Sequence, residues 1–244
     1  MKKLTVLLVA VLMLGASFAA SAQAAIQVEG DVYAGIWDKY MWRGFNLSDS
    51  RPTVQAGVDL SAGGWTLSTW HNWQLTSSDD LRSGELNETD IILTYAFDLG
   101  DMISMSVGDI FYSLDFDGAE DTNELFVTAT LNTLLSPNLK VSWDWDAAEE
   151  EGLFYSLDIS HSFDIAEKTA LNLGALVSYN QHCDYAVGDY AGWHNYELSA
   201  SLDYALTDQL TISPIFILSS GISSSAKDAI DTETAGALNL TFTF

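Results

Sequence analysis

The sequence predicts an all-β protein, a transmembrane antiparallel up-and-down β-barrel of about twelve strands. Three observations carry this prediction: an export-type N-terminus, a repeated two-residue alternation of apolar and polar side chains, and connectors that are short and long in turn. Beyond the N-terminal segment, no apolar run approaches the roughly 20 residues that a membrane helix needs. The strand boundaries leave ten or fourteen strands as alternatives.

The N-terminal segment has the layout of a secretory signal peptide. Lys2 and Lys3 precede an apolar run over residues 4–14, and small residues lead to Ala22-Gln23-Ala24. We expect cleavage after Ala24, with residues 1–24 as the signal peptide and residues 25–244 as the barrel, exported through the Sec pathway. A retained N-terminal anchor is the alternative, but the apolar run is too short to span a bilayer.

Period-two alternation recurs along the rest of the chain. In residues 91–99 and 196–204, for example, every second side chain is apolar. This pattern is typical of strands with one apolar and one polar face. The expected strands are 28–44, 52–62, 65–76, 88–99, 102–113, 123–132, 138–146, 152–164, 168–180, 193–205, 209–219 and 234–244.

The connectors between these strands show a second regularity. Some are very short, such as 63–64 and 100–101, and the intervening ones are generally longer and polar, such as 77–87, 181–192 and 220–233. Outer-membrane barrels combine tight periplasmic turns with longer outer loops in this way. A soluble β-sandwich would show the same alternation within strands, and it is the alternative fold.

The charge balance excludes one class of partner. Without residues 1–24 the chain has 7 basic and 34 acidic residues, a net charge of −27. Because nucleic acids are held by basic side chains that displace counterions, no nucleic-acid partner is expected. The single cysteine, Cys183, leaves no intramolecular disulfide.

Carboxylates fall on the polar face of the expected strands. With the apolar face turned to lipid, they would line the lumen and favour cations over anions. Two alternatives remain open: the acidity is a solubility or high-salt adaptation of the whole surface, or the lumen is filled by its own side chains. The predicted pore-lining residues are Glu29, Asp31, Asp59, Asp90, Asp98, Glu124, Asp144, Asp158, Glu197 and Asp203.

The C-terminal segment 238–244 alternates and ends on Phe244. It resembles the C-terminal assembly signal of outer-membrane barrels, in which a terminal Phe is read by the insertion machinery. The resemblance implies a Gram-negative outer membrane, with its lipids and lipopolysaccharide as surroundings and the barrel-insertion machinery as a partner of the last strand.

A second resemblance lies in the segment Tyr40-Met41-Trp42-Arg43-Gly44-Phe45-Asn46-Leu47-Ser48 and in Pro52 to Gly57. These residues are similar to the Y-x-[FW]-R-G-x-S…P-x-x-Q-x-G segment of the TorF family, a set of small proteobacterial barrels classed with porins. Asn46 stands where that family usually carries Ser. The resemblance implies a barrel and a channel.

Arg43 is the most informative residue of this segment. An arginine among so many acids is expected to pair with carboxylates and to brace the first outer hairpin. Gly44 permits unusual backbone at the strand end, and Pro52 suits the first residue of the next strand. The frame of the first strand would turn Asp38 toward lipid, so a bulge is expected near Asp38.

No catalytic or metal motif is found in the sequence. Neither G-x-S-x-G nor a Ser/His/Asp arrangement is present. Four metal-capable residues, His182, Cys183, Asp184 and His194, gather near one expected outer loop, but their spacing fits no standard zinc motif. We interpret them as residues of a solvated loop, and expect no cofactor.

The leading functional prediction is a porin-like channel for passive, cation-favouring diffusion of small solutes or cations. The alternative is a closed structural or adhesin-like surface barrel that acts through its outer loops. A barrel hydrolase is a third reading, without a motif to support it.

Overall fold

The computed structural model describes residues 27–78, 81–116, 118–149 and 152–244. The predicted signal peptide and its cleavage site lie outside the described residues.

Twelve long strands make up the wall of the molecule, and two very short strands pair separately. The wall strands are β1 (Glu29–Trp37), β4 (Thr53–Ala62), β5 (Trp65–Gln74), β6 (Leu86–Leu99), β7 (Ile103–Leu114), β8 (Thr122–Leu131), β9 (Asn138–Asp144), β10 (Leu153–Ala166), β11 (Thr169–Gln181), β12 (Ala191–Ala205), β13 (Leu210–Gly221) and β14 (Glu233–Thr243). The short pair is β2 (Met41–Trp42) and β3 (Phe45–Asn46).

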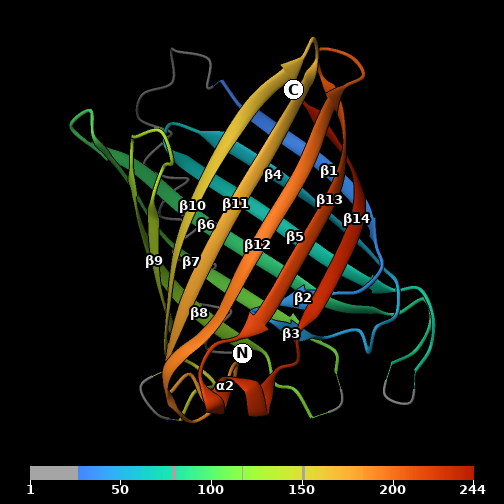
Figure 1. Ribbon diagram of the computed structural model, residues 1–244, viewed down its shortest axis with the longest axis vertical. Helices are drawn as coiled ribbons and strands as arrows, with labels where there is room; N and C mark the ends of the chain where they lie inside the picture. Colours follow the sequence, from blue (N-terminus) through green and yellow to red (C-terminus); the bar gives the residue numbers. More distant parts are fainter. Residues whose placement is uncertain (1–26, 79–80, 117, 150–151) are drawn as a thin grey trace, which may run out of the picture.

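The wall is a closed antiparallel barrel in which each strand pairs with its neighbours in sequence (Figure 1). Closure joins the first strand to the last: β1 pairs with β14 from Asp31↔Thr243 to Trp37↔Ala237. Backbone hydrogen bonds of 2.9 and 3.0 Å between Gly30 and Phe244 extend this seam. No sheet edge is left unpaired in the wall, which is the condition for a sheet to lie in lipid. The predicted fold class and strand number are confirmed.

The two faces of the barrel differ in polarity. On β1, for instance, Val32 and Ile36 are exposed apolar residues, and Asp31 and Tyr33 point to the opposite face. On β10, Leu157 and Phe163 are exposed and Asp158 lies on the opposite face. Each of the twelve wall strands carries at least one exposed leucine, isoleucine, valine or aromatic side chain. This outward apolar surface suits hydrocarbon.

Short and long connectors separate the barrel into two ends. The end with the short connectors, such as 63–64, 100–102 and 167–168, is called the turn end here. The end with the long connectors is the loop end. It also carries the helix α2 (Ser224–Ala229), seen at the bottom of Figure 1. No helix in the described ranges is long and apolar enough to cross a membrane.

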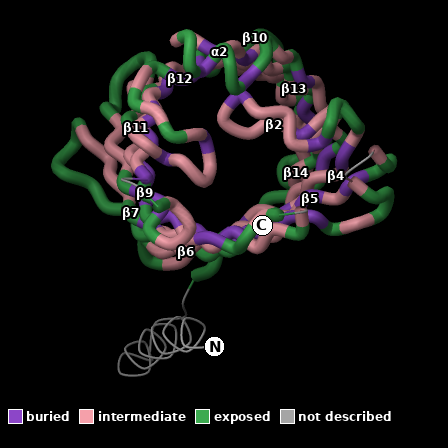
Figure 2. The backbone as a smooth tube through the Cα atoms, turned by 90° about the horizontal axis from the view of Figure 1, so that it is seen from below, coloured by how far each residue is buried: buried purple, intermediate pink, exposed green. Residues whose placement is uncertain are grey.

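One prediction about the wall is wrong. The first strand was expected to run through residues 28–44, but β1 ends at Trp37. The expected bulge at Asp38 is instead the point where the chain leaves the sheet. Asp38 N donates to Gly236 O at 2.9 Å, and Gly236 N donates to Asp38 Oδ1 at 3.0 Å. From there the chain turns inward, and Figure 2 shows β2 inside the ring of wall strands.

Candidate functional site

The inward-folded connector is built around a two-residue hairpin. Met41 pairs with Asn46 and Trp42 with Phe45, so that Arg43 and Gly44 form the turn. Both turn residues have positive φ, 49° at Arg43 and 83° at Gly44, as a tight type I′ hairpin requires. A side chain at Gly44 would also meet Ile230 Cδ1 at 2.6 Å. The Arg-Gly pair of the sequence motif therefore shapes the tip of this connector.

Arg43 fixes the tip to the far wall. Its Nη2 atom donates to Glu124 Oε2 on β8 at 2.5 Å, and the two side chains are 9% and 2% exposed. The guanidinium carbon lies 4.3 Å from the ring centroids of both Trp42 and Phe154. Burial opposes the charge of Arg43, but the Glu124 carboxylate outweighs it and holds the pKa of the guanidinium above its ordinary value. The expected carboxylate pair exists, and it braces a lumen segment.

Aromatic contacts hold the base of the hairpin to the wall. The ring of Tyr40 lies 5.3 Å from Trp70 of β5, and Trp42 meets Tyr112 of β7 edge-on at 6.1 Å. The backbone closes on itself where Tyr40 N donates to Ser48 Oγ at 2.8 Å. Such ring pairs add to the apolar burial that stabilises the segment.

His194 is a site residue that the sequence prediction missed. It lies on β12, fully buried, and its Nε2 atom hydrogen-bonds to Arg43 O at 2.7 Å. Its other nitrogen, Nδ1, pairs with the hydroxyl of Tyr190. The Arg43 carbonyl can only accept, so Nε2 carries a proton and donates to it, which fixes the hairpin tip from a second side. In the neutral ring Nδ1 then accepts from the Tyr190 hydroxyl, which keeps its proton because burial raises the pKa of Tyr190 to about 12.

Cys183 is also part of this structure. The thiol is fully buried with Phe154 and Val187, and Arg43 Nη1 lies 3.8 Å from its sulfur. Burial raises the pKa of Cys183 to about 11, so it remains a neutral thiol. The interpretation of Cys183 and His194 as solvated loop residues is therefore wrong, because the inward connector packs against both. In the sequence both residues stand next to an expected loop, and nothing there indicates the buried connector that they contact.

Two further motif residues act through shape. Pro52 lies directly before β4 instead of opening it, and its carbonyl accepts a hydrogen bond from Leu75 N at 3.0 Å. Gly57 lies within β4 opposite Tyr33, where a Cβ atom would come within 2.4 Å of the Tyr33 hydroxyl. The absence of a side chain at Gly57 thus makes room for an inward ring.

The ten acids predicted to line the lumen share the face opposite to the exposed apolar residues. Strand register supports this: Asp31 is level with Asp59, and Glu124 with Asp144. They do not form one cluster. Asp90, Glu124 and Asp144 are buried at the loop end, beside the inward connector, whereas the others are half-buried or exposed: Glu29, Asp31, Asp59, Asp98, Asp158, Glu197 and Asp203.

Glu88 belongs to the loop-end group and was omitted from the prediction. It is 4% exposed and lies two residues before Asp90 on the same face of β6. The alternation of β6, continued back by one step, would have found it. Tyr40 donates a hydrogen bond to its carboxylate, which links Glu88 to the inward connector.

Several buried oxygens of this group have no hydrogen-bond partner. They are Glu88 Oε2, Asp90 Oδ1, Glu124 Oε1 and Asp144 Oδ2. Nearby positive charge comes from Arg43 and from Lys140, whose Nζ lies 4.6 Å from the Phe126 ring centroid. Four carboxylates thus face two cations, and bare carboxylate oxygens in a buried place attract positive charge.

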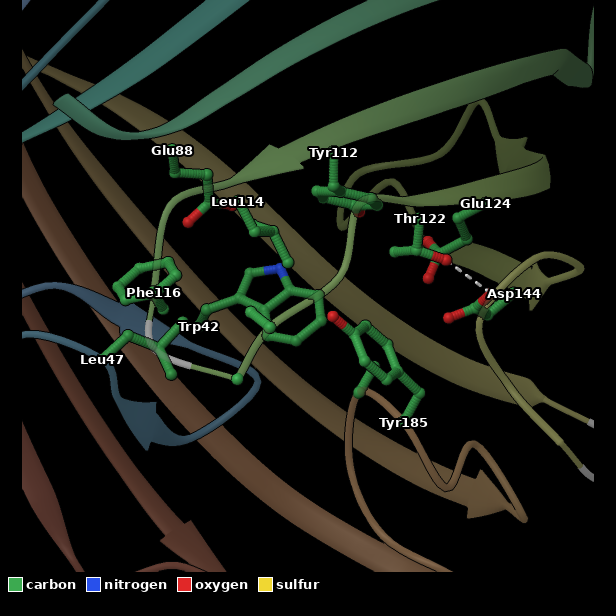
Figure 3. Close-up of a pocket in the computed structure, with 13 residues that line it drawn as sticks. Trp42, Leu47, Glu88, Tyr112, Leu114, Phe116, Thr122, Glu124, Asp144 and Tyr185 are labelled. Atoms are coloured by element: carbon green, nitrogen blue, oxygen red, sulfur yellow. Dashed lines mark hydrogen bonds between the residues drawn. The ribbon is translucent and has the colours of Figure 1, made fainter. Parts of the chain in front are cut away.

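A cavity of about 420 Å³ lies at the loop end, between the inward connector and β6 to β9 (Figure 3). Rings and carboxylates form its walls together. The rings come from Trp42, Tyr112, Phe116 and Tyr185, and the carboxylates from Glu88, Glu124 and Asp144. Among the described residues, no three His, Cys, Asp or Glu side chains are close enough to hold a metal ion.

Comparison with solved structures shows the same fold. The chain is 17% identical to the NanC porin, with a TM-score of 0.55 over 87% of this chain and 98% of that one. It is 12% identical to the KdgM porin, also with a TM-score of 0.55, over 88% of this chain and 99% of that one. KdgM has also been solved in complex with disordered oligogalacturonate.

Comparison by sequence adds no family. No family model matches the chain, and no curated protein does so either. The resemblance of the segment from Tyr40 to Gly57 to the TorF family therefore stays an expectation. The comparisons establish that the twelve-stranded barrel shares its fold with the NanC and KdgM porins.

Proposed function

We propose that the protein is a porin-like channel of the outer membrane, through which small solutes pass by passive diffusion with a preference for cations. The observation that carries the proposal is the composition of the narrowed loop end. There the inward connector meets four buried carboxylates but only two basic side chains, Arg43 and Lys140. A net negative constriction favours cations, because fields are least screened where the passage is narrow and dry.

The fold supports the location. A closed barrel with an outward apolar surface and tight turns at one end is the architecture of outer-membrane proteins, and the NanC and KdgM porins share it. The turn end, where β1 begins and β14 ends, would face the periplasm. Phe244, paired with Gly30 at the seam, would be presented to the insertion machinery.

The solute class proposed here differs from that of a solved relative. The KdgM porin was solved with oligogalacturonate, which is a polyanion. A lumen with buried, unpartnered carboxylates would repel such a ligand. The proposal therefore carries over the barrel and the channel from these porins, but not an anionic solute.

One observation favours a second candidate, a closed surface barrel that acts through its loops. The inward connector is tied to β5, β7, β8, β10 and β12, and such a segment can fill a lumen of this size. Its loops would then be the functional surface.

Planar-bilayer recording under a KCl gradient separates the two. The refolded protein, shown to be β-structured by circular dichroism, is expected to give discrete current steps and a reversal potential on the cation-selective side. An anion-selective reversal potential would refute the cation preference. Silence from the folded protein would refute the channel and support the closed barrel.

A further inference from the structure

Two carboxylates that line the cavity at the loop end are each hydrogen-bonded on one side and have one oxygen without a partner. Glu88 receives a hydrogen bond from Tyr40, and its Oε2 atom has no partner. Asp144 Oδ1 accepts from Thr122 Oγ1 at 2.8 Å and from Ala147 N at 3.0 Å, while Asp144 Oδ2 has no partner. Both residues are at least 96% buried. Each carboxylate is thus preorganised and lacks a positive partner.

Neither carboxylate is neutralised by a basic side chain in the described structure. Glu124, which also lines the cavity, is paired with Arg43. The other ion pairs among the described residues join Lys39 with Glu233, Arg82 with Glu85 and His182 with Asp189. Burial of an unpaired carboxylate is costly, and a cation in the cavity would offset that cost.

The spacing and the walls indicate the kind of cation. Glu88 lies on β6 and Asp144 on β9, three strand intervals away and at different levels along the strands, so they are more than roughly 14 Å apart along the wall. A single small ion cannot contact both carboxylates at that separation. The surface between them is formed largely by Trp42, Tyr112 and Tyr185, whose rings suit methylene groups and ammonium centres.

Tyr185 also shows how the cavity is closed on its outer side. Its hydroxyl donates to Glu120 O and accepts from Glu120 N at 2.7 Å, so that the connector after β11 is tied to the connector after β7. Asp184 of the same connector accepts from Glu149 N at 3.1 Å. Three loops therefore build one wall, which gives the cavity a defined shape.

We infer that this cavity binds a linear aliphatic amine with two or more ammonium groups, one at Glu88 and one at Asp144, with the methylene chain against Trp42 and Tyr112. As a statement about cargo, the inference deepens the proposed function and rests on it. Binding itself does not require conduction and can be measured without it.

The test is calorimetric titration of spermidine into the refolded full-length barrel in detergent micelles. Saturable binding is expected. Glu88→Gln, which keeps the shape of the side chain, should weaken it by about tenfold or more, since a charge-assisted contact is lost. Asp144→Asn should do the same. The matched control is Asp101→Asn in the exposed turn after β6, which removes the same charge at the opposite end and should leave the affinity unchanged.

Magnesium ion is the control ligand for spermidine, because it carries charge but no methylene groups. It carries two charges in one centre, so it should bind more weakly than spermidine and depend less on Glu88. Absence of saturable spermidine binding by the folded protein would overturn the inference. The inference would also be overturned if Glu88→Gln and the unchanged protein bound spermidine with equal affinity. The same holds if magnesium bound as tightly as spermidine and depended as strongly on Glu88.

The two proposals fail separately. A protein that binds spermidine in micelles but passes no current in bilayers would refute the channel and leave the amine site. A channel that conducts cations but does not bind spermidine would refute the amine site alone.

Discussion

Side chains that point into the barrel are buried in one half of the lumen and exposed in the other. On β6, Glu88 and Asp90 at the loop end are 4% and 9% exposed, whereas Asp98 on the same face at the turn end is exposed. On β10, Phe154 is buried at the loop end and Asp164 is exposed at the turn end. The strands continue through both halves, so the wall itself does not cause the difference.

The cause is the connector between β1 and β4. It covers the inward side chains of the loop-end half, whereas those of the turn-end half remain accessible to solvent. At the turn end the carboxylates are satisfied by short hydroxyl and amide side chains, as Asp98 is by Ser104 at 2.7 Å and Asp158 by Asn138 at 2.9 Å. Selectivity and binding should therefore be set at the loop end, where charges are buried and few are paired.

The largest effect is expected from releasing the inward connector, which covers the loop-end half of the lumen. Arg43→Ala leaves Glu124 buried without its partner, and loss of one member of a buried pair costs about 3–5 kcal/mol. The inward connector should be released from the far wall, and single-channel conductance should rise. Arg82→Ala removes an exposed arginine, 84% accessible and 3.4 Å from Glu85, and should change nothing. Equal conductance in both variants would show that the connector does not narrow the lumen.

A smaller effect is expected from the second anchor of the hairpin tip. His194→Ala leaves the Arg43 carbonyl and the Tyr190 hydroxyl without partners, at a cost of about 1–3 kcal/mol. Hydrogen–deuterium exchange of residues 40–48 should accelerate. His161→Ala is the control, because His161 bonds to Leu134 O near the turn end and should leave that exchange unaltered. Unchanged exchange in His194→Ala would refute the anchoring role.

A third effect is expected from neutralising one aspartate in each half of the same strand, β6. Asp90→Asn should move the reversal potential toward zero more than Asp98→Asn does. The reason is that a buried charge acts through a medium of low dielectric constant, while water and salt screen an exposed one. Reversal potentials of both variants under one KCl gradient, recorded at alkaline pH so that both aspartates are ionised, test this. A larger shift for Asp98→Asn would place the selective region at the turn end.

The smallest effect concerns Cys183. Because burial raises its pKa to about 11, the folded protein holds the thiol proton more tightly than an unfolded chain does. Its contribution to stability is complete below the ordinary thiol pKa near 9.0 and is lost as pH rises through about 11. Labelling by a thiol reagent should therefore be slow at pH 8 and accelerate steeply in that window. Rapid labelling at pH 8 would show that the loop around Cys183 is open.

Much of this architecture could be predicted from the sequence. Alternation in residues 153–163 and 196–204 predicted strands that β10 and β12 confirm, because period two follows directly from strand geometry. Counting the alternating segments predicted about twelve strands, and connectors that are short and long in turn indicated a membrane barrel. The motif around Arg43 indicated a carboxylate partner, and Glu124 was among the acids expected in the lumen.

The path of residues 38–52 could not be predicted in the same way. The first strand was expected to continue past a bulge at Asp38, since a break in the alternation does not show whether a strand bulges or leaves the sheet. Glu88, Cys183 and His194 were missed or misread for a related reason. Each acquires its role from the inward connector, which is distant in sequence and adjacent only in the folded barrel.

The barrel, its two faces and its excess of carboxylates follow from the sequence alone, because strand period and composition are local properties that hold wherever the strands lie. Which carboxylates matter depends on the folded barrel. Burial and pairing depend on what is brought across the lumen, and the hairpin of Arg43 and Gly44 reaches β8 and β12 there. A carboxylate is consequently hydrogen-bonded and water-accessible at Asp98, but buried at Glu88 with one oxygen that has no partner.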